Sequence, residues 1–150
     1  MSRIEKENCY LEMAQTISQR STCRRYHCGV VIANEEEIIA TGYNGAPKGR
    51  DHCTDLEQCA ELEGKPCRGV PAEVNAIAAA DHKACRGATL YMACVNVQTG
   101  ELEARCPGPY SQGLIINAGI SRVVVLTAPG RYEVYNVPDW VFNDDTLPGV

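Results

Sequence analysis

The sequence lacks the features that would place the protein in a membrane or on a nucleic acid. No apolar run approaches the roughly 20 residues that span a bilayer, and residues 2–8 do not form the basic and apolar segments of a secretory leader. Basic residues are in the minority, since 14 Lys and Arg face 19 Asp and Glu and give a net charge of −5. We therefore expect a soluble chain with a small-molecule ligand, no membrane association and no nucleic-acid polymer as partner.

Repeats and linkers are also missing, and 150 residues are enough for one buried core. A single domain is therefore predicted over residues 1–150. Cysteine is the residue type in excess, with nine in the sequence. Because their number is odd and no leader is evident, metal ligands and small buried thiols explain them better than a disulfide framework. The expected compartment is the cytoplasm.

The spacing of apolar residues predicts alternating helices and strands. Apolar residues at positions 10, 13, 14 and 17 indicate a first helix over residues 4–19. Short runs rich in β-branched residues predict strands, and Pro or Gly at segment ends marks further helices. The strands are expected at 29–33, 38–42, 88–94, 123–126 and 131–137, and the later helices at 71–80 and 107–118. This order predicts an α/β fold with a central mixed five-stranded sheet and helices on both faces.

Three segments show no such pattern. Residues 95–104 are predicted to form a hairpin excursion after the third strand, and the residues after Pro138 have no clear period. The longest segment, residues 43–70, combines Gly and Pro residues with three cysteines. A segment of this length inside a compact domain needs something to order it.

Several separate motifs agree in order and spacing with one protein family. They are Ser21-Thr-Cys23, Gly42-Tyr-Asn-Gly45, Asp51-His-Cys53, Ala72-Glu-Val-Asn-Ala-Ile77, Ile115-Ile-Asn-Ala-Gly-Ile120 and Tyr135-Asn-Val-Pro138. The chain thereby resembles the cytidine and deoxycytidylate (dCMP) deaminase superfamily, and in particular its viral and bacterial dCMP deaminase branch. The resemblance implies a cytidine-deaminase-like three-layer sandwich, a role in pyrimidine nucleotide metabolism, and a homo-oligomer, by analogy a hexamer. The resemblance to viral members also implies that the cytoplasm in which the protein acts could be that of a virus-infected bacterial host.

The resemblance singles out the residues that would hold a catalytic zinc. In the family, a His two residues before a Glu and two Cys of a Pro-Cys-x-x-Cys turn bind the metal, and the Glu moves protons. The Glu corresponds to Glu73, but the three ligand positions fall on Pro71, Gly108 and Ser111. These side chains are not zinc ligands. No catalytic zinc is therefore expected.

Other cysteines leave two further metal sites open. Cys94 and Cys106 flank the expected pocket and could rebuild a catalytic zinc site with His82 or Glu73, although Cys94 also fits a small buried residue and Cys106 a loop thiol. The resemblance also implies one structural zinc per chain, which would order residues 43–70. Its ligands would be Cys23, Cys53, Cys59 and Cys67, with His52 as an alternative fourth ligand. Cys9, Cys28 and Cys85 are left as core or surface residues.

Nucleotide recognition is expected from residues that the resemblance marks as retained. Asn44 matches the position that contacts a nucleoside, and the other substrate-binding candidates are Tyr43, Gly45, Tyr110, Ser111 and Arg24. Arg24 lies close to Arg20 and Arg25, which together form either an anion site or a solvated face. Glu73 either faces the base or caps the backbone of its own helix.

Three functions remain open at this point. The first is altered, zinc-independent chemistry on a pyrimidine (deoxy)nucleotide, with Glu73 as acid or base and Cys94 or Cys106 as nucleophile. A cysteine with a lowered pKa beside the pocket would favour it. The second is a non-catalytic nucleotide sensor or partner subunit. The third is an active dCMP deaminase, a hydrolase, with a zinc site rebuilt on Cys94 and Cys106.

Overall fold

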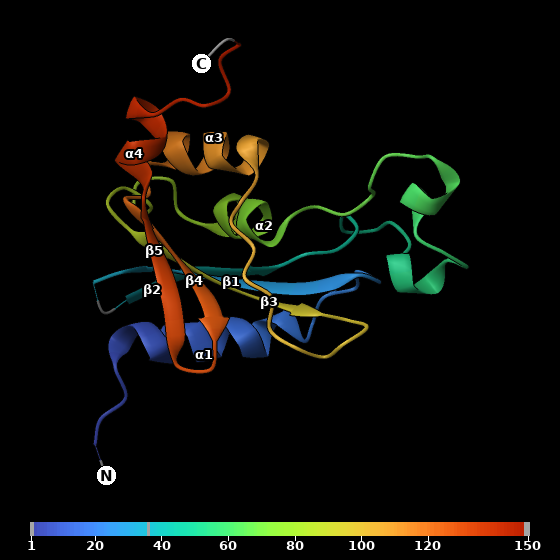
Figure 1. Ribbon diagram of the computed structural model, residues 1–150, viewed down its shortest axis with the longest axis horizontal. Coiled ribbons are helices and arrows are strands. Elements are labelled where there is room, and N and C mark those ends of the chain that lie inside the picture. Colours follow the sequence, from blue (N-terminus) through green and yellow to red (C-terminus); the bar gives the residue numbers. More distant parts are fainter. Residues whose placement is uncertain (1, 36, 149–150) are drawn as a thin grey trace.

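The computed structural model describes residues 2–35 and 37–148. Its centre is one sheet with the strand order β2-β1-β3-β4-β5 (Figure 1). The strands are β1 (Tyr26–Asn34), β2 (Glu37–Tyr43), β3 (Thr89–Asn96), β4 (Arg122–Ala128) and β5 (Arg131–Asn136). Only β3 and β4 run parallel, and the other neighbouring pairs are antiparallel. The predicted mixed five-stranded sheet is thus confirmed.

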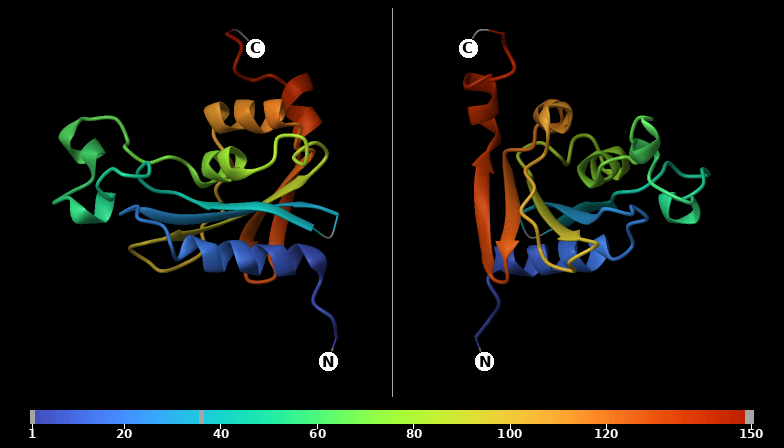
Figure 2. Two further views of the ribbon diagram at one scale, coloured as in Figure 1. Left: turned by 180° about the vertical axis from the view of Figure 1, so that it is seen from behind. Right: turned by 45° about the vertical axis from the view of Figure 1, so that its right-hand side comes forward.

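Helices cover both faces of this sheet. One face carries α1 (Lys6–Ser18), and the other carries α2 (Ala72–Ala79), α3 (Pro109–Ala118) and α4 (Val137–Phe142) (Figure 2). Side chains alternate along β1, so Val30 and Ile32 join the core beneath α2 and α3 while Val31 joins the core beneath α1. The three layers confirm the predicted α/β sandwich.

Two glycines let the helices approach the β1–β2 hairpin closely. A Cβ atom at Gly42 would lie 2.6 Å from the carbonyl oxygen of Ala72 and 2.6 Å from the backbone nitrogen of Ala76, both in α2. A Cβ atom at Gly29 would collide with the backbone of α1. The hairpin therefore packs between two helices with backbone-to-backbone contact at Gly29 and Gly42. This contact fixes the position of the first turn of α2.

The C-terminal part differs from the sequence prediction. Residues after Pro138 had no recognisable period, yet Val137–Phe142 form α4 and Val137 is buried. Six residues make less than two helical turns, which is too short for an apolar stripe to recur. No helix within residues 2–35 or 37–148 is long and apolar enough to cross a membrane.

The segment of residues 46–69, called the side lobe below, extends away from the sheet (Figure 1). It contains two short 3-10 helices, η1 (Cys53–Asp55) and η2 (Ala60–Glu63). Its two ends meet, because Gly45 and Val70 exchange backbone hydrogen bonds of 3.2 and 2.7 Å. The lobe therefore leaves and rejoins the domain at one place.

Candidate functional site

A cavity of about 490 Å³ lies where the ends of β1 and β2, the first turns of α2 and α3, and the side lobe meet. This volume is in the range of small-molecule sites. Most of the predicted site residues line it: Glu73, Cys106, Asn44, Gly45, Tyr110, Ser111, Arg24, Cys23, Cys53, Cys59 and Cys67. Tyr43 and Cys94 are not part of the lining. The chain thus brings its candidate residues together from four stretches, at residues 23–24, 44–45, 53–73 and 106–111.

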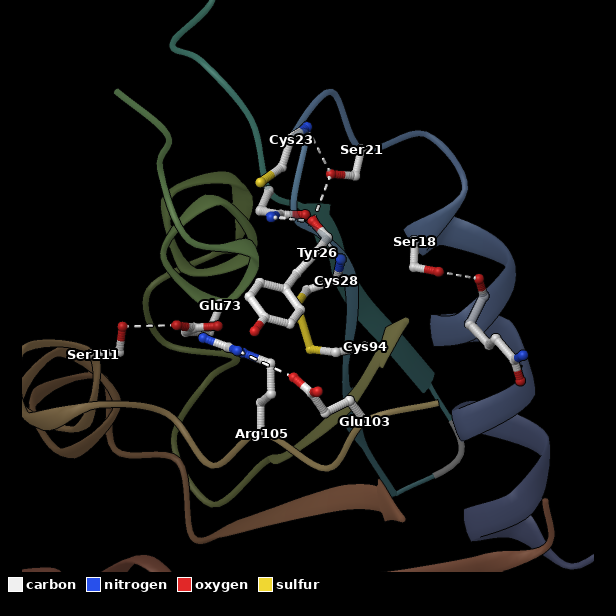
Figure 3. Close-up of a disulfide and its surroundings, with 12 residues drawn as sticks. Ser18, Ser21, Cys23, Tyr26, Cys28, Glu73, Cys94, Glu103, Arg105 and Ser111 are labelled. Atoms are coloured by element: carbon white, nitrogen blue, oxygen red, sulfur yellow. Dashed lines mark hydrogen bonds and ion pairs between the residues drawn. A yellow bond between two sulfur atoms is a disulfide. The ribbon is translucent and has the colours of Figure 1, made fainter. Parts of the chain in front are cut away.

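Glu73 is the buried carboxylate of this cavity. It belongs to the first turn of α2 and is only 4% exposed. Its Oε1 accepts a 2.7 Å hydrogen bond from the Ser111 hydroxyl on α3 (Figure 3). Its Oε2 has no hydrogen-bond partner among the described residues. Ser111, rather than the backbone of α2, is thus the partner of Glu73, and a donor from a ligand would satisfy the open acceptor.

The three expected zinc-ligand positions line the same cavity but do not fit that metal. Pro71 forms the N-cap of α2 and has no side-chain lone pair, and Gly108 has no side chain. The hydroxyl of Ser111 donates to Glu73. Within the described part of the chain, no group of three or more His, Cys, Asp or Glu side chains is arranged to hold a metal ion.

Cys94 needs a correction, because it is bonded to Cys28 in a disulfide. The two residues face each other on the antiparallel strands β1 and β3, with Cα atoms 4.1 Å apart. A sulfur in this bond is neither a free nucleophile nor a free zinc ligand. The sequence offered no signal for it, because the partners are 66 residues apart and strand pairing was not deducible from the pattern.

Cys106 is one of the free thiols that line the cavity. It is exposed overall, yet partial burial of its thiol raises the pKa, and the charges of Glu133 and Glu73 raise it further. The protonated form therefore predominates near neutral pH. A lowered pKa, which a cysteine nucleophile requires, is not found at Cys106.

Asn44 is used by the protein itself. Its Oδ1 accepts a 2.9 Å bond from the Cys28 backbone N–H, and its Nδ2 donates a 2.9 Å bond to the Tyr26 carbonyl. Both groups of the side-chain amide thus hydrogen-bond the backbone of β1, and they continue the pairing of the two strands beyond the end of β2. Asn44 shapes the cavity by fixing the backbone of Tyr26 and Cys28.

The neighbours of Asn44 have different positions. Gly45 lines the cavity, and a Cβ atom there would collide with the Thr22 side chain. Tyr43 instead offers its carbonyl to the side-chain amide of Asn75 at 2.8 Å. Tyr110, in the first turn of α3, lines the cavity with 78% of its surface exposed. Gly45 and Tyr110 therefore remain candidates for ligand contact.

Sequence reasoning missed a stacked pair at the cavity wall. The Arg105 guanidinium lies 3.8 Å from the centroid of the Tyr26 ring and 3.3 Å from the Glu103 carboxylate (Figure 3). Such stacking is a favourable cation–π contact. Arg105 follows residues 95–104, which form the predicted hairpin excursion with an antiparallel bridge between Val95 and Leu102. The Glu103 N–H donates to the Cys94 carbonyl at 2.9 Å.

Two of the three arginines considered as an anion site or a solvated face, Arg24 and Arg25, bind the side lobe. The Arg24 guanidinium donates to the carbonyl groups of Cys53 and Leu56. Arg25 forms a 2.7 Å ion pair with Glu61, which raises the pKa of Arg25. Both arginines line the cavity, whereas Arg20 does not. Their contacts connect the lobe to the segment between α1 and β1.

The four predicted structural-zinc cysteines face the cavity from the lobe and from the segment after α1. Backbone N–H groups donate to two of the sulfurs, from Arg25 to Cys23 and from Gly69 to Cys67, each at 3.4 Å. Hydrogen bonds of this kind support ligand atoms around metals. The donor set therefore suits zinc in kind, although the four sulfurs do not form a converged group in the described part of the chain. His52 is not in the lining.

Comparisons with known proteins agree with this geometry. A family model described as the cytidine and deoxycytidylate deaminase zinc-binding region matches residues 4–127. The deoxycytidylate deaminase of Mycobacterium phage D29 is 32% identical over 136 residues, which cover 83% of this chain and 96% of that protein.

Solved structures show the same fold. The dCMP deaminase of cyanophage S-TIM5, in complex with dCMP and dUMP, has a TM-score of 0.60 and 26% identity over 82% of each chain. A cytidine deaminase from Burkholderia pseudomallei shares the fold at 15% identity, with a TM-score of 0.60 over 97% of this chain and 99% of that one. The sequence match, the shared sheet and the cavity around Glu73 lead to one conclusion: this chain belongs to the cytidine and deoxycytidylate deaminase family.

Proposed function

We propose that the protein binds a pyrimidine (deoxy)nucleotide in the cavity around Glu73 and does so without a catalytic zinc. The cyanophage relative, whose structure contains dCMP and dUMP, supports this class of ligand. The cavity has a suitable volume, and Glu73 offers a buried acceptor for an N–H group of a base. In this proposal the cavity recognises the nucleotide, and Glu73 acts as the acid or base of a zinc-independent reaction on it.

The Ser111–Glu73 hydrogen bond carries the proposal. A serine hydroxyl occupies the position where the resembled family has a zinc-binding thiolate, and it donates to the carboxylate that would move protons. Pro71 and Gly108 supply no replacement ligand. A water molecule activated by a metal at these three positions is therefore not part of the proposed chemistry.

A second candidate is a nucleotide sensor that binds without turnover. It is favoured by the state of the two thiols considered as nucleophiles, because Cys94 is bonded to Cys28 and Cys106 has a raised pKa. An active dCMP deaminase is the third candidate. It is supported by the similarity to the dCMP deaminases of Mycobacterium phage D29 and cyanophage S-TIM5. It requires a rebuilt zinc site, and the Cys28–Cys94 bond removes one of its expected ligands.

Two further features are proposed with this function. One structural zinc per chain would be held by Cys23, Cys53, Cys59 and Cys67, where it would connect the side lobe to the segment after α1. The protein would act in the cytoplasm as a homo-oligomer, and light scattering of a hexamer would give about six times the subunit mass of 16.3 kDa.

The proposal is tested by calorimetry with dCMP and dUMP, combined with an ammonia-release assay and elemental analysis of the same preparation. We expect binding by the wild type, weaker binding by Glu73→Gln, and no release of ammonia. Ammonia release that depends on a second zinc per chain would overturn the zinc-free site. Absence of binding for both nucleotides would overturn the nucleotide-binding function itself.

A restored variant gives the complementary test. Gly108 has room for a side chain, because a Cβ atom there would meet nothing within 4 Å. We expect Pro71→His, Gly108→Cys and Ser111→Cys together to add one zinc per chain. Pro71→His and Gly108→Cys without the third change serve as the control, since two ligands do not complete the site. An unchanged zinc content in the triple variant would show that the cavity cannot place these ligands.

A further inference from the structure

The Cys28–Cys94 disulfide is part of the wall of the nucleotide cavity. Cys28 is among the lining residues, and Tyr26, two residues earlier on β1, is on the same face of the strand. Both cysteines are buried, with Cys28 5% and Cys94 1% exposed. Figure 3 shows the bond in the region between the two strands, with Tyr26, Arg105 and Glu73 drawn around it. A chemical change at this bond is therefore a change in the binding site.

Backbone contacts hold both cysteines in place. The N–H of Cys28 donates to Asn44 Oδ1 at 2.9 Å, and its carbonyl accepts from the Asn44 backbone at 3.3 Å. The Cys94 carbonyl accepts from the Glu103 N–H at 2.9 Å. Cleavage of the bond would thus be accommodated by the side chains rather than by movement of the strands.

The two sulfurs differ in the room available to them. Unbonded sulfur atoms require van der Waals separation, which is wider than a covalent bond. Both cysteines belong to the core beneath α2 and α3, but only Cys28 also lines the cavity. After reduction, the Cys28 thiol is therefore the group that moves, and it moves into the space a ligand would use.

We propose that the oxidation state of Cys28 and Cys94 controls nucleotide binding: the disulfide form binds, and the dithiol form binds weakly. The proposal rests on the proposed nucleotide-binding function. A small dithiol supplies the two electrons and two protons that convert the disulfide into two thiols, and the dithiol itself becomes a disulfide. In a reducing compartment, which is the expected setting, disulfides are mostly transient and redox-sensing.

Thermodynamic linkage makes the effect reciprocal. A nucleotide that prefers the disulfide form must make that form harder to reduce by the same factor. The bond also joins residues 66 positions apart, so reduction is expected to lower the melting temperature as well. Affinity measured far below the melting temperature separates control of the cavity from simple loss of stability.

The experiment measures the Kd of dCMP for air-oxidised protein and for protein reduced with dithiothreitol, with alkylation and mass spectrometry to assign the thiols. We expect binding to weaken on the order of tenfold on reduction, a typical size for coupling between sites. Saturating dCMP should raise, by the same factor, the ratio of reduced to oxidised dithiothreitol at which half of the Cys28–Cys94 bond is reduced. Cys94→Ala should bind dCMP as weakly as the reduced wild type in both conditions, because its Cys28 thiol is free whether or not dithiothreitol is present.

Each other result overturns the proposal in a distinct way. Alkylation of Cys28 and Cys94 in the oxidised protein would show that the bond does not form. Equal affinity in both states would show that the bond does not control the cavity, and tight binding by Cys94→Ala would show that a free Cys28 sulfur is not the obstruction. Absence of dCMP binding in either state would instead remove the proposed function on which the inference rests. Cys9→Ser, which changes a thiol on α1, should respond to dithiothreitol as the wild type does.

Discussion

At the scale of single residues, the hydroxyl of Ser111 determines how Glu73 is held. Ser111→Ala removes the donor to Oε1 and leaves a buried carboxylate without its partner. We expect a loss of about 1–3 kcal/mol in the free energy of unfolding, together with weaker dCMP binding. Denaturant unfolding and calorimetry measure the two effects.

Ser121→Ala is the matched control for Ser111. The Ser121 hydroxyl also donates a hydrogen bond, but to backbone, at 3.1 Å from the carbonyl oxygens of Gly87 and Ala88, and Ser121 is not part of the cavity lining. Its loss should lower stability and leave the Kd of dCMP unchanged. Equal effects of both variants on the Kd would mean that Ser111 acts through general stability and not through Glu73.

At the scale of elements, the close contact between β2 and α2 fixes the position of Glu73. Gly42→Ala places a methyl group against the backbone of Ala72 and Ala76. We expect a loss of about 1–3 kcal/mol in unfolding free energy, as for other overpacked positions. The displaced first turn of α2 should also weaken dCMP binding, and calorimetry measures this directly.

Gly113→Ala provides the comparison for Gly42. Gly113 is inside α3, and a Cβ atom there would meet nothing within 4 Å. The change should stabilise the protein by about 0.5–1 kcal/mol without affecting the Kd. If Gly42→Ala were as well tolerated as Gly113→Ala, the contact between β2 and α2 would not be the constraint that the structure indicates.

The elements were largely predictable because their patterns are local. The five strands and the first three helices follow from apolar period and from Pro or Gly at their ends, and Gly119 ends α3 in the left-handed region. The six-residue α4 was missed because it is too short to show a period. Glu73, Ser111 and the cysteines around the cavity followed from motif positions. Their contacts did not, since the Cys28–Cys94 bond depends on which distant strands pair, and the Arg105–Tyr26 stack depends on where the segment between β3 and α3 runs.

At the scale of the whole molecule, the side lobe is the part whose order depends on the proposed structural zinc. Cys59→Ser removes one of the four proposed ligands at the N-cap of η2. We expect loss of about one zinc per chain and faster proteolytic cleavage within residues 46–69, because the released segment opens more readily. Elemental analysis and limited proteolysis with mass spectrometry measure these outcomes.

Cys9→Ser controls for the loss of a thiol elsewhere in the chain, since Cys9 is in α1 and outside the cavity lining. It should retain the zinc and the cleavage pattern of the wild type. Zinc retained in Cys59→Ser would exclude Cys59 as a ligand. A wild-type protein without zinc would leave the arginine contacts with the lobe as the source of its order.

The meeting of Gly45 and Val70 makes the side lobe a closed side branch of the polypeptide. The free energy of closing such a loop grows only slowly with its length. Strand β2 ends just before the closure and α2 begins just after it. We therefore expect that shortening or lengthening the side lobe leaves the register of β1 and β2 unaltered, and also the position of α2 against the hairpin. The protein can in this way change the outer boundary of its cavity as a separate unit, and ligand range can be engineered there without redesign of the domain.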